Sequence, residues 1–408
     1  MNLKNAIQII GIIPEDGLMA VYVKFVTAKK FVADSIKRKK RNNNMNITIS
    51  TKTLAGALAE LAPIAARKTA VMVLNNIKFV IKAGRARLQA SDGETTVRKY
   101  ISLDSSDCDG EFLVNGTDIN TYVSAIRSDI CLLEVSDTIL TVQGGKSKAK
   151  FPVFNSAEFF EPVMPEDVVK VNMPATILKA IINAGSKFVS TDIMRPHMRP
   201  IRAIVENSFL TFCATDTRKL ITDTYSLGEG NPDTAWNIEQ NAFGAISKAC
   251  NGGADMDVNI SESIVSYRCG DNMVFTVQTK GKYPEFQRVI PRTHTIDCEI
   301  SRGDVSDALR RMSPFAEASR LVKLSLTGME ATLQTCNIAE GKEASDSMLC
   351  TCNGDITIGL HADHFSVCLG AVDSSDMLLE LTDRSRPVVV KDKSNPNRVI
   401  VFMPMNIG

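Results

Sequence analysis

The chain has 408 residues, of which 44% are hydrophobic and 23% charged, so its composition is that of a globular protein of several domains and not of a disordered chain. No apolar run reaches the roughly 18 residues that a transmembrane helix needs, which argues against a membrane protein. The ten cysteines are scattered and only four histidines are present, which disfavours a disulfide-stapled secreted fold and favours the cytoplasm.

Charge differs between the first 44 residues and the rest. Residues 1–44 carry nine Lys or Arg against three Asp or Glu, whereas the remaining 364 carry 38 basic and 43 acidic residues. We interpret 1–44 as a basic N-terminal extension that is disordered or lies upstream of a true start at Met45. A solvated arm that touches phosphates is the alternative. Because the bulk of the chain is mildly acidic, affinity for nucleic acid must come from where charges are placed.

From Met45 onward, one series of elements occurs three times. An opening strand at 45–50 leads into an amphipathic helix, and alternating apolar residues then predict a β-hairpin followed by a second helix. The hairpins end at Asp92, Asp216 and Asn337, which are 124 and 121 residues apart, and Phe159 recurs 124 positions later as Tyr283. The first helices are predicted at 51–66, 174–189 and about 302–316, the hairpins at 77–92, 201–216 and 322–337, and the second helices near 118–128, 238–250 and 362–372.

A repeat of this length is a whole domain, because solenoid repeats span only about 20–50 residues. Two amphipathic helices can cover one face of antiparallel sheets in each copy. The sequence therefore predicts an α+β fold with three tandem copies of one domain, placed at 45–163, 164–292 and 293–408.

Several motifs resemble those of the bacterial DNA polymerase III β subunit family, the β sliding clamps. They are GKYPEFQRVIP at 281–291, the ending Val401 to Met405, Ala214-Thr215-Asp216 with Lys219-Leu220, and Arg195-Pro196. The resemblance runs from Met45 to the C-terminus. It implies three DNA-clamp domains per chain and a head-to-tail dimer that closes into a six-domain ring. Twelve helices spaced at about 9–10 Å would leave a bore of roughly 25 Å, which admits duplex DNA.

The resemblance also implies a function: a non-enzymatic processivity factor that slides on duplex DNA without sequence preference and tethers the replicative DNA polymerase. An ATP-driven clamp loader would open the ring, no cofactor is needed, and the location would be the cytoplasm, at the nucleoid. A closed ring suits this task because non-specific contacts, with dissociation constants of about 10⁻⁴–10⁻⁶ M, cannot by themselves hold a polymerase on its template.

Three sets of candidate residues follow: two carried over from the family's motifs and one taken from the basic residues of the predicted inner helices and loops. A pocket for partner peptides between domains 2 and 3 would use Arg195, Met198, Thr215, Arg218, Leu220, Pro284, Arg288, Val289, His361, His364, Val401, Met403, Pro404 and Met405. The DNA-facing candidates on the inner helices and loops are Lys52, Arg67, Lys68, Arg127, Lys179, Lys187, Lys248, Arg310 and Arg311, diluted by Asp118, Asp304 and Asp307. The dimer interface would use Phe151, Val153, Pro314 and Phe315.

The chain departs from the family pattern at three places in this pocket. The family commonly has Gly or Ala and then His where this chain has Thr217-Arg218, and Asn and Tyr where it has His361 and His364. Met198-Arg199-Pro200 replaces a turn of small residues. We expect the domain shape to survive and the peptide preference to shift. The main alternative function is a diverged clamp-fold adaptor that binds peptides without encircling DNA, and a hydrolase on a repeated α+β scaffold is a third class.

Motifs for other chemistry are incomplete. Gly144-Gly145-Lys146-Ser147 lacks the first glycine of a phosphate loop, because that position is Leu140, so it predicts a hairpin turn. His361 and His364 have a spacing that can ligate zinc but no neighbouring ligand pair, and Cys350 and Cys352 predict same-face positions on one strand. Without a nucleophile motif or acidic cluster, the sequence favours no enzyme and no metal.

Overall fold

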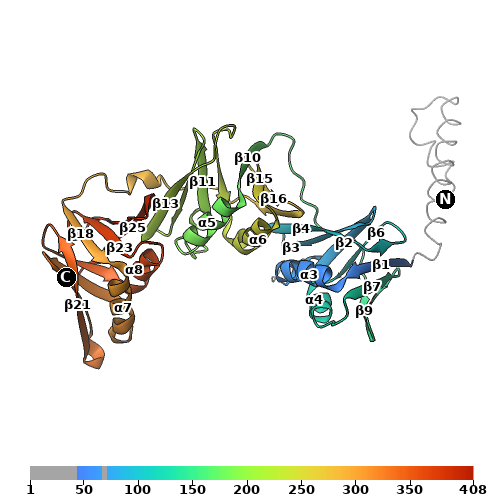
Figure 1. The fold of residues 1–408 in the computed structure, drawn as a ribbon, viewed down its shortest axis with the longest axis horizontal. Helices are drawn as coiled ribbons and strands as arrows, with labels where there is room; N and C mark the ends of the chain where they lie inside the picture. Colours follow the sequence, from blue (N-terminus) through green and yellow to red (C-terminus); the bar gives the residue numbers. More distant parts are fainter. Residues whose placement is uncertain (1–43, 67–70, 408) are drawn as a thin grey trace, which may run out of the picture.

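The computed structural model describes residues 44–66 and 71–407. The predicted basic extension, apart from Asn44, and the DNA-facing candidates Arg67 and Lys68 lie outside the described residues. Within the described part, the chain forms three units of like construction that follow one another along an open arc (Figure 1). No helix among these residues has both the length and the apolar character needed to cross a bilayer.

Each unit repeats one order of elements: a strand, a helix, three strands, a fourth strand, a second helix and three more strands. Unit 1 consists of β1 Met45–Ser50, α3 Thr51–Ala65, β2 Asn76–Lys82, β3 Arg85–Ser91, β4 Thr95–Ser102, β6 Gly110–Asn115, α4 Gly116–Ser124, β7 Ile130–Val135, β8 Ile139–Gly144 and β9 Ser147–Pro152, with the short β5 Ser105–Ser106 in addition. Unit 2 consists of β10 Val169–Pro174, α5 Ala175–Gly185, β11 Ile201–Glu206, β12 Phe209–Thr215, β13 Lys219–Ser226, β14 Thr234–Ile238, α6 Phe243–Ala249, β15 Asp255–Ile260, β16 Ile264–Cys269 and β17 Asn272–Val277. Unit 3 consists of β18 Ile296–Ser301, α7 Arg302–Met312, β19 Leu321–Thr327, β20 Glu330–Asn337, β21 Lys342–Cys352, β22 Ile356–His361, α8 Ala362–Leu369, β23 Asp376–Leu381, β24 Val388–Asp392 and β25 Asn395–Phe402.

The repeat predicted from the sequence is therefore confirmed in its elements. The opening strand 45–50, all three hairpins and the turn at Gly145 form as predicted. The predicted domain boundaries fall in the stretches between β9 and β10 and between β17 and β18, and we keep them as predictions.

The predicted helices are correct in place but too long at their C-terminal ends. Lys187 was predicted on a helix, but α5 ends at Gly185 because the buried side chains of Phe188 and Val189 turn the chain into the core. Arg127 likewise lies in the loop after α4, which ends at Ser124. Apolar periodicity continues past a helix end whenever the following loop also packs inward, so it cannot mark that end.

Neighbouring units are joined by continuous β-sheet. In one joint, β17 of unit 2 pairs antiparallel with β4 of unit 1, and in the other β25 of unit 3 pairs antiparallel with β13 of unit 2. The first joint completes an eight-stranded sheet and the second a twelve-stranded one. In both joints the last strand of one unit pairs with a strand of the unit before it. That partner is the third strand of the run after the first helix, β4 in unit 1 and β13 in unit 2.

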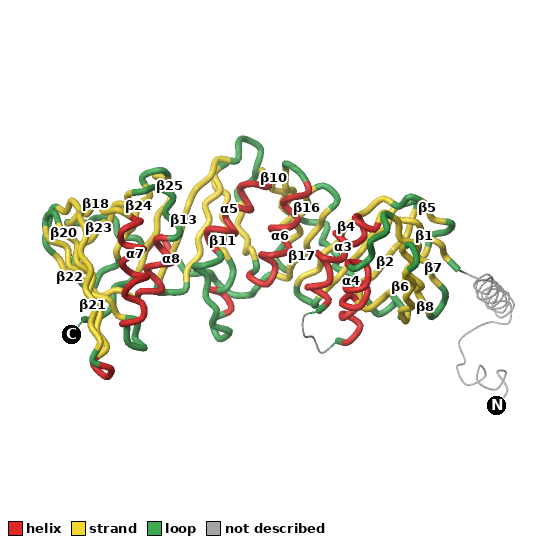
Figure 2. The backbone as a smooth tube through the Cα atoms, turned by 60° about the horizontal axis from the view of Figure 1, so that its bottom comes forward, coloured by secondary structure: helices red, strands yellow, loops and turns green. Residues whose placement is uncertain are grey.

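The helices all lie on the concave side of the arc. Figure 1 shows α3 to α8 along the inner edge with the sheets outside them, and Figure 2, turned so that this edge comes forward, shows the helices on the near face. Each pair packs against its own sheets through one apolar stripe. In α3 this stripe includes Leu54, Leu58 and Leu61, all with no exposed side-chain surface.

Local sequence explains how these helices begin and meet. The hydroxyl of Ser50 accepts a hydrogen bond from the amide of Thr53 at the start of α3, and the amide oxygen of Asn115 does the same for Asp118 in α4. The two helices approach closely at Gly116, where a Cβ would lie 2.9 Å from the Cβ of Ala65. A larger residue there would push the helices apart.

The linkers between units are anchored by buried aromatic residues. Phe159 packs with Leu74 and Leu113 in the first linker, and beside it Glu161 accepts from Lys78, Arg87 and Arg98 at 2.9, 3.0 and 2.7 Å. In the second linker, Tyr283 donates to the carbonyl of Cys213 at 3.1 Å and Phe286 is buried. These anchors hold each linker against the joint that it crosses.

Candidate functional site

The clearest apolar cavity lies at the joint between units 2 and 3. Here Leu220 of β13 is paired with Val401 of β25, so side chains from two units meet on one face of the sheet. The cavity has a volume of about 160 Å³. It is lined by Met198, Thr215, Thr217, Arg218, Lys219, Leu220, Pro284, Phe286, Val289, Val401 and Met403.

The cavity has a buried floor and an exposed apolar mouth. Leu220, Phe286 and Val401 are 2–4% exposed, whereas Val289 and Met403 are 46% and 37% exposed. Exposed apolar side chains around a preformed hollow are the usual sign of a binding site for an apolar group. The methionines can shift to suit side chains of different shape.

One wall of the cavity is a tight turn between β12 and β13. Asp216 accepts hydrogen bonds from the amides of Arg218 and Lys219, both at 2.9 Å, and also forms an ion pair with the Lys219 ammonium, which is buried. The turn forces Thr217 to a φ of +78°. This is the left-handed region, which β-branched residues rarely adopt, so the turn holds backbone strain at the cavity wall.

Three arginines lie in the chain segments that line the cavity, and two of them are paired. Arg195 lies 3.6 Å from Asp192, and Arg288 lies 2.9 Å from Glu285. Arg218 is exposed. Its guanidinium forms no ion pair with a carboxylate among the residues that the structure describes. The mouth therefore carries an uncompensated positive charge next to its apolar lining.

The structure brings together most of the predicted pocket residues. Eight of the fourteen line the cavity: Met198, Thr215, Arg218, Leu220, Pro284, Val289, Val401 and Met403. Arg195, Arg288, His361, His364 and Pro404 do not line it. Met405 leaves it as well, because its amide donates to the carbonyl of Gly359 at 2.8 Å and so adds to the edge of β22.

Three lining residues were not predicted. Phe286 lies inside the 281–291 motif, where its position between Glu285 and Gln287 gave no sign that it points inward. Lys219 was named only as part of the motif Lys219-Leu220 and not as a lining residue, and its burial depends on the ion pair with Asp216. Thr217 joins the lining because of its unusual φ, which no sequence pattern indicates.

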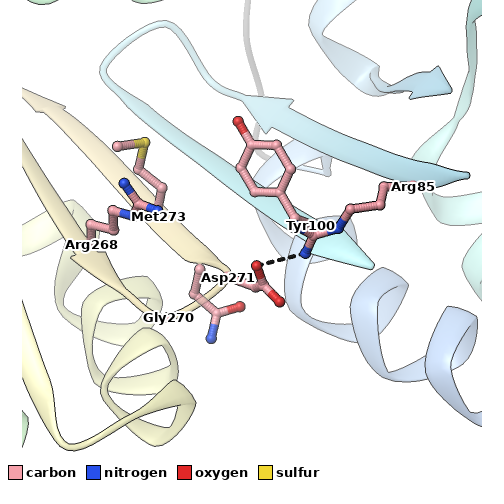
Figure 3. A pocket seen from close by; sticks show the side chains of 7 residues that line it. Arg85, Tyr100, Arg268, Gly270, Asp271 and Met273 are labelled. Carbon is pink, nitrogen blue, oxygen red and sulfur yellow. Dashed lines mark hydrogen bonds and ion pairs between the residues drawn. The ribbon is translucent and has the colours of Figure 1, made fainter. Parts of the chain in front are cut away.

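A second cavity lies at the joint between units 1 and 2 and is polar. Figure 3 shows Arg85 and Tyr100 of unit 1 facing Arg268, Asp271 and Met273 of unit 2 across it. Arg85 pairs with Asp271 at 2.7 Å, and its guanidinium carbon lies 5.9 Å from the centre of the Tyr100 ring. Since side chains of 51% and 62% exposure form this pair, we assign it a bridging role of small energy and no binding function.

The concave face carries charge of both signs. The six helices among the described residues hold six basic and five acidic residues. Of the described DNA-facing candidates, all are exposed. Arg310 and Arg311 are paired with Asp307 and Asp346, and Lys179 donates to the side chain of Asn251 at 2.9 Å. Lys52, Arg127, Lys187 and Lys248 form no ion pair with a carboxylate among residues 44–66 and 71–407.

The predicted interface residues lie at opposite ends of the arc. Phe151 and Val153 are at and just after β9, both half-buried, and Phe151 packs edge-on against Tyr122 with ring centres 5.7 Å apart. Pro314 and Phe315 follow α7 in unit 3. Among the described strands, β9 pairs only with β8, and residues 342–349 of β21 pair only with β20.

The His and Cys pairs singled out in the sequence lie in unit 3. His361 precedes α8 and His364 lies in its first turn, and Cys350 and Cys352 both lie on β21. In the part of the chain that the structure describes, no group of three or more His, Cys, Asp or Glu is arranged to hold a metal ion.

Two family models match the chain. The model described as DNA polymerase III beta subunit, N-terminal domain, matches residues 45–165, and the model of the C-terminal domain of the same subunit matches residues 287–406. Curated relatives cover nearly the whole of the same region. The chain is 25% identical over 383 residues to the beta sliding clamp of Rickettsia bellii, covering 89% of this chain and 100% of that protein, and 22% identical over 362 residues to the beta sliding clamp of Helicobacter pylori, covering 85% and 94%.

Solved structures agree on the fold. The sliding clamp, DNA polymerase III subunit beta, from Pseudomonas aeruginosa superposes with a TM-score of 0.85 at 19% identity, over 90% of this chain and all of that one. The DNA polymerase sliding clamp from Bacillus subtilis gives a TM-score of 0.85 at 18% identity with the same coverage.

Proposed function

Since the chain belongs to the bacterial DNA polymerase III beta subunit family, we infer that it is a DNA sliding clamp, which encircles duplex DNA and keeps the replicative polymerase on it. The observation that supports this proposal is that the two ends of the arc carry the strands for one more joint of the same kind, unpaired with each other. Units 1 and 2, and units 2 and 3, are joined by the same pairing: the last strand of one unit with the third strand of the three-strand run in the other. At one end of the arc a last strand lacks such a partner, and at the other end a third strand lacks one.

Those two strands are β9 and β21. In the repeat, β9 corresponds to β17 and β25, and β21 corresponds to β4 and β13. By this equivalence, β9 of one copy would pair antiparallel with β21 of a second, near residues 342–346. Two copies joined head to tail at both ends would close into a ring of six units, and closure removes both exposed sheet edges.

The chemistry of the two edges supports this pairing. Lys148 and Lys150 lie on β9, and Glu343 lies on the facing part of β21. On that same part of β21, Asp346 is already paired with Arg311 and Lys342 with Glu340. Phe151 and Val153 would meet Pro314 and Phe315 as the apolar part of the same contact. Strands of opposite charge pair readily with each other and poorly with a second copy of themselves.

The ring would hold DNA by enclosing it and not by gripping it. The near balance of six basic and five acidic residues on the helices gives only a weak electrostatic attraction to phosphates. Weak, non-specific contacts allow sliding, and the closed ring prevents escape. We propose that Lys52, Lys187 and Lys248 supply these contacts.

The apolar cavity at the second joint would bind short peptides of the polymerase and of other partners. Its size and its exposed methionine suit one or two aliphatic side chains of an extended segment. We further propose that the chain itself is non-catalytic, that an ATP-driven clamp loader opens the ring, and that the protein works in the cytoplasm at the nucleoid.

The deciding experiment is retention on DNA. Purified protein is loaded onto nicked circular duplex with a clamp loader, separated from free protein by gel filtration, and followed before and after the circle is cut once. A clamp stays on the circle at high salt and is lost within minutes of linearisation. A clamp-fold adaptor that does not encircle DNA would behave alike on both forms.

A matched pair of variants tests the closure mechanism. Phe151→Asp should produce monomers in sedimentation and abolish retention, because it places a charge in the proposed apolar contact. Phe209→Asp, at a 52% exposed phenylalanine on β12 away from both ends of the arc, should leave dimer and retention unchanged. If both variants stay dimeric and retained, β9 is not the ring joint.

A further inference from the structure

Two imidazole rings lie stacked beside the apolar cavity. His361 and His364 have ring centres 4.0 Å apart with their planes inclined by 14°. Both are half-buried, and the Nδ1 of His361 is buried without a hydrogen-bond partner among the described residues. A stacked pair with an unused nitrogen is an uncommon arrangement for residues that only fill space.

The charges around this pair come from both units at the joint. From unit 2, Arg218 and Lys219 act electrostatically on both rings and Asp216 acts on His364. From unit 3, Arg320 and Asp363 act on His361. Two of the three cations are already paired, Lys219 with Asp216 and Arg320 with Asp363 at 3.7 Å. Arg218 has no such carboxylate and also lines the cavity, so it links the rings to the apolar pocket.

The rings are held in their neutral form in the free protein. Burial lowers the pKa of His361 most, and Arg218, Arg320 and Lys219 lower it further against the opposing effect of Asp363. Burial also lowers the pKa of His364 most, followed by His361 and Lys219. The site therefore combines an exposed guanidinium with two neutral imidazoles, and burial outweighs the opposing effects of Asp363 on His361 and of Asp216 on His364. An additional negative charge beside the rings would favour their protonation.

We propose that Arg218, His361 and His364 form a carboxylate-binding subsite beside the apolar cavity, which takes an Asp or Glu side chain of the partner peptide and takes up a proton from solvent when it binds. The inference rests on the proposed role of the cavity as a peptide site and specifies its ligand: an aliphatic anchor with an adjacent acidic residue. It also gives a role to the residues at which this chain departs from its family's pattern.

The expected linkage follows from the charges. A bound carboxylate stabilises an imidazolium, so the pKa of the pair rises on binding and the peptide binds more tightly as the pH falls. Because the rings are stacked, protonating one disfavours protonating the other, and about one proton is taken up per peptide. A peptide with Asn in place of Asp has no charge to offer and should show no such linkage.

The test uses the full-length protein and fluorescein-labelled hexapeptides. Each contains two adjacent leucines, with Asp or Asn placed either before or after them, and fluorescence anisotropy gives Kd at pH 7.5 and pH 5.5. The better-binding Asp peptide should bind about fivefold more tightly at pH 5.5, while its Asn counterpart changes by less than about twofold. In parallel, NMR of the histidine ring protons should show two pKa values that rise when the Asp peptide is added.

Variants separate the subsite from the pocket. His361→Asn with His364→Tyr, the residues that the family commonly has, should remove the pH dependence and leave binding of the Asn peptide intact. Arg218→Gln should remove most of the preference for Asp over Asn. Arg288→Gln, an exposed arginine at the same mouth that is paired with Glu285, should change neither.

Equal affinity for the Asp and Asn peptides at both pH values would overturn the subsite, as would pH dependence that survives in the double histidine variant. Failure of every peptide to bind would overturn it too. None of these three results bears on ring closure. Retention on circular DNA is measured without peptide, and it tests the proposed clamp function separately.

Discussion

The joint between units 2 and 3 contains a buried ionic cluster whose removal should loosen the partner pocket. Arg398 of β25 donates from Nε to Asp223 of β13 at 3.1 Å, and from Nη1 to Asp373 and to the carbonyl of Ala371, both at 2.8 Å. Asp392 lies 3.7 Å from the same guanidinium. The side chain of Arg398 is 12% exposed, and those of Asp223 and Asp392 are 1% and 0% exposed.

Replacing Arg398 by Met keeps the unbranched apolar stem of the side chain and removes the guanidinium with its charge. The carboxylate of Asp223 then stays buried without its cation, a change that typically costs about 3–5 kcal/mol. We expect the lower end, about 3 kcal/mol, because Asn395 still donates to Asp223 at 2.8 Å and Ser394 still donates to Asp392. The double variant Asp223→Asn with Arg398→Met should cost less than Arg398→Met alone, since it leaves no unpaired buried charge on β13.

Native-state hydrogen exchange measures this change at the joint. The amides of 219–222 and 399–402, which pair across it, should exchange roughly a hundredfold faster in Arg398→Met, the factor that corresponds to about 3 kcal/mol. Exchange in unit 1 should not change. The affinity of the pocket for a bound peptide should fall with it, because Leu220 and Val401 line the pocket from the two sides of the joint.

Arg85→Met is the matched control at the other joint. Its Arg–Asp pair also connects two units, but both side chains are more than half exposed, so the expected cost is below about 1 kcal/mol. Equal effects of the two substitutions would refute the argument that burial of Asp223 makes Arg398 necessary. So would a double variant that is less stable than Arg398→Met.

Three further predictions concern other parts of the molecule. Thr217→Gly should raise the free energy of unfolding by about 1 kcal/mol in urea titration, because glycine adopts a φ of +78° without strain; a lower midpoint would contradict this. Burial alone would raise the pKa of Asp392, but hydrogen bonds from Ser394 and the Asp373 amide outweigh it, and the net pKa is lowered. Its stabilising contribution is therefore complete above about pH 4 and decreases as the pH falls toward the lowered pKa of the folded state. Asp392→Asn should lower the melting temperature at pH 7, and the difference from wild type should be smaller at pH 2.5. Lys52→Gln with Lys248→Gln should weaken non-specific DNA binding without affecting dimerisation. It should reduce the slope of log K against log salt by up to about 3.6, because the two copies in the ring lose four lysines; an unchanged slope would mean that these lysines do not contact phosphates.

The sequence predicted what depends on neighbours along the chain. The alternation at 45–50 gave the opening strand to the residue, and the hairpins at 77–92, 201–216 and 322–337 formed as expected because side chains alternate between faces wherever a strand packs on a core. It failed at Lys187 and Arg127, where the apolar pattern continues beyond the helix into loops that also pack inward.

Most of the pocket was within reach of the sequence because it is built from short motifs that carry their own signal, such as the 281–291 stretch. The exceptions are instructive. Lys219 is part of the lining only because Asp216 neutralises it, and His361 and His364 lie outside the lining and form a pair of their own. In both pairs the partners are three residues apart, so the spacing permits the contact, but the burial of Lys219 and the position of the rings relative to the cavity depend on the fold around them.

The sequence by itself therefore determined that this protein is a threefold repeat of one α+β unit, because the periodicity of apolar residues is a local property that survives without knowledge of contacts. The tertiary structure alone decided which strands join the units, where Asp223 meets Arg398 from 175 positions away, and which two edges remain open. The physical reason is that a strand's own residues fix which face it buries, whereas its partner is chosen by the whole sheet, through packing and hydrogen bonds between segments that are far apart in the chain.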